Sequence, residues 1–166
     1  MPASQAPPSP PDDLCERVMR TAREAATFEE VPVAAMICEH DESSGEWREL
    51  ACERNRIVER GDPTAHAEML ALRAACEMQK SERLRNAALI VSLEPCMMCT
   101  GALVLARVDR IYYFAPTEKG AGMSELLEAT RDNAYRVNHY PEFVALDEYR
   151  AECAALLRRF FRERRT

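Results

Sequence analysis

The spacing of apolar residues along the chain predicts four helices. They cover residues 12–26, 65–78, 96–106 and 148–164. In the first, Leu14, Val18 and Ala22 recur at helical spacing behind two aspartates that are N-cap candidates. The second follows Asp62-Pro63-Thr64, which has the turn and capping chemistry typical of a helix start.

Four other stretches have the apolar and β-branched composition of strands. They cover residues 31–38, 47–53, 87–93 and 109–114. The first two are joined by a polar, glycine-containing turn, which predicts a hairpin. The third is almost continuously apolar, as expected for a central strand buried on both faces. Alternation of strands and helices predicts a three-layer α/β domain with a mixed sheet.

The ends of the chain differ in character from this central part. Residues 1–11 are rich in Pro, Ser and Ala and cannot bury enough apolar surface to offset chain entropy, so we expect a disordered tail followed by a single domain over 12–166. Neither a run of about 20 apolar residues nor a signal sequence is present, which predicts a cytoplasmic protein without a membrane span.

Charge and cysteine content narrow the possible partners. The net charge of −6 argues weakly against binding polyanions over the whole surface, because such binding depends on cationic contacts with phosphates. A local basic patch lies at the C-terminus, although a solvated helix end is an equally valid interpretation. It contains Phe160 and Phe161 among Arg158, Arg159, Arg162, Arg164 and Arg165. The seven cysteines include a C-x-x-C pair, which indicates thiols and a metal rather than disulfides.

Three candidate metal ligands lie at the starts of two predicted helices. His66 opens one helix, and Cys96 and Cys99 open another about thirty residues later. One His and two Cys match the three protein ligands of a catalytic zinc site, in which water takes the fourth position. The positive ends of the helix dipoles favour the thiolates that bind metal. The pattern predicts a catalytic zinc centre.

Glu68 follows His66 by two residues, which places it about 200° around an ideal helix and makes it a poor second ligand. A carboxylate near a zinc-bound water is instead suited to moving protons in hydrolytic deamination. Taken alone, such a Glu is usually a dipole-compensating residue, and a C-x-x-C is often structural or redox-active. Together with Pro95, these residues match the H-x-E and P-C-x-x-C signature of zinc deaminases that act on nucleobases.

The motifs resemble those of the bacterial tRNA adenosine deaminases over nearly the whole chain after the tail. The matching segments are 30–33, 55–56, 62–68, 93–102, 106–107, 138–139 and 152–162. The resemblance implies a three-layer α/β/α cytidine-deaminase-like fold with a central mixed five-stranded sheet, and a homodimer with one Zn²⁺ per subunit. It further implies conversion of adenosine to inosine at the wobble position of a tRNA anticodon loop, with zinc-bound hydroxide as the nucleophile and Glu68 as the proton shuttle.

The same resemblance implies roles for residues outside the metal centre. Asn55 would hydrogen-bond the flipped base, Val31 and Leu93 would line its pocket, and Ala67 would offer its backbone to the purine. The implied RNA-contacting residues at the C-terminus are Phe160, Phe161 and Arg162. From the residues alone, all of these are equally consistent with ordinary packing or turn positions.

Two departures from the family pattern leave the substrate open. Ala34 stands where the family usually has Gly, and 114–117 reads Phe-Ala-Pro-Thr where the family usually has Gly-Ala-x-Asp. We expect both changes to affect substrate contacts, so a deaminase of a free base or nucleoside, of guanine, cytidine or adenosine type, is the alternative. A silent partner subunit is a third possibility, against which the intact Glu68 argues.

Overall fold

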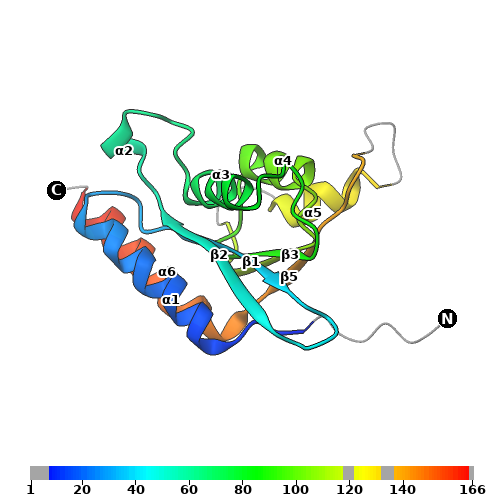
Figure 1. Ribbon diagram of the computed structural model, residues 1–166. Helices are drawn as coiled ribbons and strands as arrows, with labels where there is room; N and C mark the ends of the chain where they lie inside the picture. Colours follow the sequence, from blue (N-terminus) through cyan, green and yellow to red (C-terminus); the bar gives the residue numbers. More distant parts are fainter. Residues whose placement is uncertain (1–7, 118–121, 132–136, 165–166) are drawn as a thin grey trace.

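A five-stranded sheet runs through the middle of the computed structural model, which describes residues 8–117, 122–131 and 137–164 (Figure 1). The strands are β1 (Ala34–His40), β2 (Trp47–Arg54), β3 (Ala87–Leu93), β4 (Arg110–Ala115) and β5 (Glu142–Ala145), in the spatial order β2-β1-β3-β4-β5. β1 is antiparallel to both β2 and β3, whereas β3, β4 and β5 are parallel. The expected central mixed five-stranded sheet is confirmed, and the carboxyl ends of β3 and β4 lie at the same edge.

Helices cover both faces of the sheet (Figure 1). They are α1 (Asp12–Thr27), α2 (Ile57–Arg60), α3 (Ala67–Gln79), α4 (Met97–Leu105), α5 (Met123–Ala129) and α6 (Asp147–Glu163). α1 and α6 lie side by side on one face, and α3, α4 and α5 lie on the other. This is the three-layer α/β/α arrangement that the sequence predicted.

Two apolar cores fill the spaces on either side of the sheet. Alternate residues of β3 point to opposite faces, so that Leu89 and Val91 pack with α3 while Ala88 and Ile90 pack with α1 and α6. A strand that is buried on both faces has no reason to alternate polar and apolar residues. The continuous apolar run of this segment is therefore explained by its central position.

The element boundaries differ from the predicted ones mainly beside the site. β1 begins at Ala34 rather than at Val31, because the Val33 N–H donates to the Val31 carbonyl in a tight turn (N···O 2.7 Å). Three short elements were not predicted, namely α2, α5 and β5. The actual helix starts make His66 and Cys96 the N-cap residues of α3 and α4.

The predicted tail is shorter than residues 1–11. The Pro8 carbonyl accepts a hydrogen bond from the Tyr112 hydroxyl (2.7 Å), and Pro10 is buried. Disorder is therefore the wrong prediction for residues 8–11, while residues 1–7 lie outside the described part of the chain. None of the helices described here has the length and apolar character needed to cross a bilayer.

Candidate active site

Two helix starts bring the three predicted metal ligands together. His66 and Cys96 have extended backbone as N-cap residues, and Cys99 lies in the first turn of α4. Cys96 follows the end of β3 by three residues, and Pro95 disfavours helical backbone immediately before it. The end of a central strand and the start of α3 thus place the donors at one edge of the sheet.

The three donor atoms form a nearly equilateral triangle. His66 Nδ1 lies 3.7 Å from Cys96 Sγ and 3.6 Å from Cys99 Sγ, and the two sulfur atoms are 3.6 Å apart. Ligands of a tetrahedral zinc ion, with Zn–S of about 2.3 Å and Zn–N of about 2.0–2.1 Å, lie about 3.5–3.8 Å from one another. The donors therefore fit one zinc ion. Cys99 is buried but Cys96 is exposed, which leaves one side of the triangle open.

Hydrogen bonds within the triangle favour a thiolate. The contacts with Cys99 and His66 lower the pKa of the Cys96 thiol to about 3. The neighbouring Cys96 and burial raise the pKa of Cys99, and the hydrogen bond with Cys96 raises the pKa of His66. Cys96 therefore favours the thiolate form that binds metals.

Glu68 lies beside the triangle in the first turn of α3. Its side chain is only 4% exposed, and burial raises the pKa of its carboxyl group. The carboxyl is close enough to Cys99 to raise the pKa of that thiol. Within the described residues, Oε2 of Glu68 has no hydrogen-bond partner. A buried carboxyl oxygen without a partner, next to a metal triad, is suited to a proton-carrying role.

Asn55 is held in a fixed orientation next to His66. It is buried, and its Oδ1 accepts a hydrogen bond from the Ala67 N–H (2.9 Å). Because the amide oxygen is used in this way, the Nδ2 group remains as the donor. The resemblance implied that the Ala67 backbone contacts the purine directly. In the structure the Ala67 N–H donates to Asn55, and a contact of the Ala67 backbone with the purine stays a prediction.

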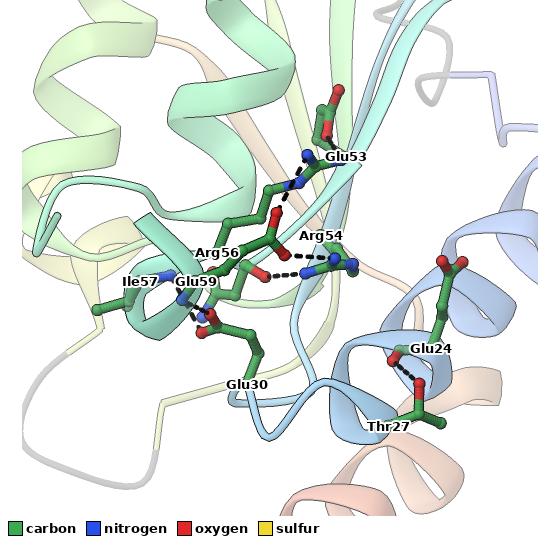
Figure 2. Close-up of polar contacts among 9 residues, drawn as sticks. Glu24, Thr27, Glu30, Glu53, Arg54, Arg56, Ile57 and Glu59 are labelled. Carbon is green, nitrogen blue, oxygen red and sulfur yellow. Dashed lines mark hydrogen bonds and ion pairs between the residues drawn. The ribbon is translucent and has the colours of Figure 1, made fainter. Parts of the chain in front are cut away.

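A buried polar network supports the segment that includes Asn55 (Figure 2). The Glu30 carboxylate accepts hydrogen bonds from the backbone N–H groups of Ile57 (3.0 Å) and Glu59 (2.9 Å). From the other side, Arg54 donates to the Asn55 carbonyl (3.1 Å) and to the Glu59 carboxylate (2.6 Å). The Asn55 carbonyl and the turn that follows it are therefore fixed.

The sequence did not assign a role to Glu30 or Arg54. Glu30 is fully buried, and the Arg54 guanidinium stacks over the Phe28 ring at 3.9 Å from its centroid. Their hydrogen-bond partners lie just after the second strand of the hairpin. Helical or strand periodicity in the sequence does not indicate such contacts. The only available signal was the position of Glu30 directly before Val31-Pro32.

The remaining predicted contact residues fall into two groups. Val31 and Leu93 are partly buried and pack against the α3-side core. Val31 lies in the turn before β1, and Leu93 ends β3. In α6, Phe161 is 46% exposed and Arg162 is exposed. Phe160, in contrast, is only 7% exposed and lies under the Arg164 guanidinium. The Phe160 ring thus packs in the protein interior, and its contact with substrate stays a prediction.

Two of the departures from the family pattern lie in the core. Ala34 and Phe114 are buried in the cluster between the sheet and the α1/α6 layer, where Phe114 stacks on Tyr149 with centroids 4.6 Å apart. The expectation that both changes affect substrate contacts is wrong for these two side chains. Thr117 differs, because its backbone N–H binds the Glu94 carboxylate beside the metal ligands (3.2 Å).

Comparison with known families agrees with this geometry. Residues 9–115 match the family model for the cytidine and deoxycytidylate deaminase zinc-binding region. The chain belongs to this zinc-binding deaminase family, and His66, Cys96 and Cys99 are the donors that the described structure brings together within 4.8 Å.

Individual relatives narrow the comparison. The chain is 37% identical to a tRNA-specific adenosine deaminase of Agrobacterium fabrum, over 90% of this chain and 93% of the relative. A solved structure from studies of A-to-I editing by tRNA:A34 deaminases at the wobble position of transfer RNA has a TM-score of 0.76 and 35% identity, covering 89% of this chain and all of that one. A guanine deaminase structure from Bacillus subtilis has a TM-score of 0.58 and 26% identity, covering 89% of this chain and 93% of that one.

Proposed function

We propose that this protein hydrolyses adenosine to inosine at the wobble position of tRNA. The observation that supports this most directly is the His66, Cys96 and Cys99 triangle with the buried Glu68 beside it. The same arrangement is part of a chain that is 37% identical to a tRNA-specific adenosine deaminase over 90% of its length. The reaction adds water to C6 of the adenine and releases ammonia.

One Zn²⁺ per subunit would be held by His66, Cys96 and Cys99. When bound there, zinc lowers the pKa of a coordinated water molecule towards neutrality. Glu68 would carry one proton of this water to the ring nitrogen and the second to the amino group, which then leaves as ammonia. Its burial and its unpaired Oε2 support this role, because this oxygen has no competing hydrogen-bond partner among the described residues.

Asn55 would select and orient the base. Its Oδ1 accepts from the Ala67 N–H, so its Nδ2 can donate to an acceptor on the purine. Val31 and Leu93 would pack against the flat faces and edges of the base, since both are apolar and only partly buried. Arg54 and Glu30 keep Asn55 in place through its carbonyl and the turn that follows it.

The RNA backbone would contact an arginine-lined groove between α1 and α6. The groove has a volume of about 460 Å³ and is lined by Arg23, Glu152, Ala155, Leu156, Arg158, Arg159 and Arg162. Arg23 is paired with Glu152, whereas within the described chain no ion pair engages Arg158, Arg159 or Arg162. Unpaired guanidinium groups on an acidic protein are suited to phosphate contacts. Phe161 and Arg162 extend this surface towards the C-terminus.

A second copy of the chain would cover the outer face of α4. The sequence of this helix has no charged residue, and Met97, Gly101 and Leu105 recur at every fourth position on its exposed side. Met97 is 70% exposed and Leu105 is 73% exposed. Exposed apolar residues in such a row mark an interface, so we infer a homodimer. A tRNA substrate also implies that the protein acts in the cytoplasm.

A deaminase of a free base is the second candidate. The 26% identity to a guanine deaminase structure and the replacement at Thr117 favour it. The two candidates differ in their dependence on salt, because a free base has no phosphates for the arginines to bind. A silent partner subunit is disfavoured by the retained Glu68.

The deciding experiment measures inosine and ammonia formation by the zinc-loaded protein. The substrates are an anticodon stem-loop with a wobble adenosine, free adenosine, guanine and cytidine. We expect turnover on the stem-loop, and a loss of about 10²- to 10⁴-fold in Glu68→Gln with unchanged zinc content. Glu77→Gln, an exposed carboxylate of the same helix, is the matched control. Turnover on a free base alone would overturn the tRNA assignment and retain the zinc chemistry.

A further inference from the structure

A second buried carboxylate, outside the metal triad, connects three elements at the site. Glu94 lies between the end of β3 and Pro95 and is only 6% exposed. Its carboxylate accepts hydrogen bonds from the Thr117 N–H (3.2 Å), the Ser124 N–H (3.1 Å) and the Ser124 hydroxyl (2.6 Å). Thr117 follows β4, and Ser124 lies in the first turn of α5. The Glu94 side chain therefore binds both Thr117 and Ser124, which are seven positions apart in the sequence.

The glycine at position 122 independently indicates how tightly this carboxylate is enclosed. A Cβ atom added to Gly122 would lie 2.2 Å from Glu94 Oε1 and 2.4 Å from Oε2. The φ angle of Gly122 is −65°, which any residue adopts, so backbone conformation does not require glycine here. The space that a side chain would occupy is filled by the Glu94 carboxylate.

The position of Glu94 relates this anchor to the substrate. β3 and β4 are parallel, Leu93 is paired with Ala115, and the Glu94 N–H donates to the Ala115 carbonyl (2.8 Å). Loops at the carboxyl ends of parallel strands border the ligand sites of open α/β sheets. Thr117 therefore flanks the start of the helix that begins at Cys96. Glu94 is not one of the three donors that lie within 4.8 Å of one another.

We propose that Glu94 is a positioning residue for substrate binding. Through Thr117 and Ser124 it fixes the chain just after β4 and the first turn of α5 next to the metal ligands, and so determines which substrates fit against the metal centre. This inference rests on the proposed deaminase function. Glu94 would affect the affinity for substrate, whereas Glu68 acts in the chemical step.

The test is the separation of KM from kcat in Glu94→Gln. Glutamine keeps one carbonyl oxygen for Ser124 but turns an NH₂ group towards the Thr117 N–H, which leaves that donor unpaired. We expect KM for the stem-loop to rise about ten- to hundredfold, since displaced positioning groups have effects of this size. The zinc content and kcat at saturation should remain close to those of the wild type.

Two further variants and one control examine the same contacts. Ser124→Ala removes only the hydroxyl contact, and its effect on KM should not add to that of Glu94→Gln, because both substitutions affect one hydrogen-bonded group. Gly122→Ala should raise KM by displacing the carboxylate. Glu125→Gln, an exposed carboxylate next to Ser124, is the matched control and should leave KM unchanged.

The outcomes separate this inference from the proposed function. Wild-type turnover on a free base alone would overturn the tRNA assignment, and the KM comparison would then be made with that base. The Kd of a fluorescent stem-loop gives the same comparison without turnover. An unchanged KM and Kd in Glu94→Gln, or a loss of zinc or of kcat with KM unchanged, would overturn the positioning role. If Glu94→Gln fails to fold, the KM values of Ser124→Ala and Gly122→Ala test the positioning role in its place.

Discussion

Glu30 shows how a single buried carboxylate determines the backbone that presents a recognition residue. Its two oxygens accept the N–H groups of Ile57 and Glu59, in the turn that follows Asn55. In Glu30→Gln, the NH₂ group of the glutamine would face one of these backbone N–H groups. Neither that NH₂ group nor the N–H group opposite it would then have an acceptor. We expect a loss of about 1–3 kcal/mol in the free energy of unfolding, measured by thermal or urea denaturation.

The Glu30→Gln variant should also bind substrate more weakly. Displacement of Asn55 should raise KM, while zinc content should not change, because none of the three donors contacts Glu30 in the described structure. Glu29→Gln is the matched control, since Glu29 is exposed and precedes Glu30 directly. Equal stability and equal KM in the two variants would show that the buried network does not support Asn55.

The metal ligands and Glu68 could be predicted from the sequence, but Glu30 and Glu94 could not. Ligand spacing is a local property, since His66 and Cys96 each open a helix that the sequence already indicated. The partners of Glu30 are 27 and 29 residues away, and those of Glu94 are 23 and 30 residues away. Such contacts depend on how the strands pair, and periodicity does not specify this.

At the scale of elements, α6 should provide the salt-dependent part of RNA binding. The double variant Arg158→Ala, Arg159→Ala removes two guanidinium groups that have no ion-pair partner among the described residues. We expect weaker binding of the stem-loop and a salt dependence, log Kd against log salt concentration, that is shallower by about 1.4–1.8. Fluorescence anisotropy of a labelled stem-loop, titrated at several salt concentrations from low to moderate, measures both the Kd and its salt dependence.

An equal change of net charge elsewhere distinguishes a phosphate site from a general charge effect. Arg83→Ala, Arg85→Ala removes two exposed arginines from the loop before β3. The salt slope of this control should match that of the wild type, and turnover of free adenosine should be the same in all three proteins. If both double variants weaken RNA binding equally, the groove has no specific part in it.

The elements that sequence patterns missed are short and depend on their neighbours. α2 has four residues, α5 has seven and β5 has four. Helices of this length are not stable on propensity alone, and their start points are fixed by contacts such as that of Glu94 with Ser124. β5 is an edge strand with little buried surface, so its sequence lacks the apolar run that revealed β3.

At the scale of the whole molecule, the sheet separates the metal donors from the arginine-lined groove. The donors and Glu68 lie at the starts of α3 and α4, whereas the groove lies between α1 and α6. These two groups of helices cover opposite faces of the sheet (Figure 1). Ala34 and Phe114 depart from the family pattern, but both are buried on the α1/α6 side of the sheet. These two side chains therefore belong to the packing between the sheet and the α1/α6 layer, and Thr117 is the departure that lies beside the metal ligands.

The outer face of α4 is exposed in the single chain, which leads to a prediction about assembly. An apolar row at this exposure is costly in water, since about 25 cal/mol is gained for each Å² of apolar surface that is buried. We expect the wild type to sediment at twice the 18.8 kDa mass of the chain. Leu105→Glu should sediment as a monomer, because an unpaired carboxylate cannot be buried in an apolar contact.

A matched substitution tests whether α4 itself forms the contact. Val58→Glu introduces the same charge at an exposed apolar residue of α2, and it should leave the dimer intact. Because α4 begins at the ligand Cys96, a dimer formed through this helix would restrict motion of the metal centre. Leu105→Glu should then lose zinc to a chelator faster than Val58→Glu does. A Leu105→Glu protein that remains dimeric would show that another surface joins the subunits.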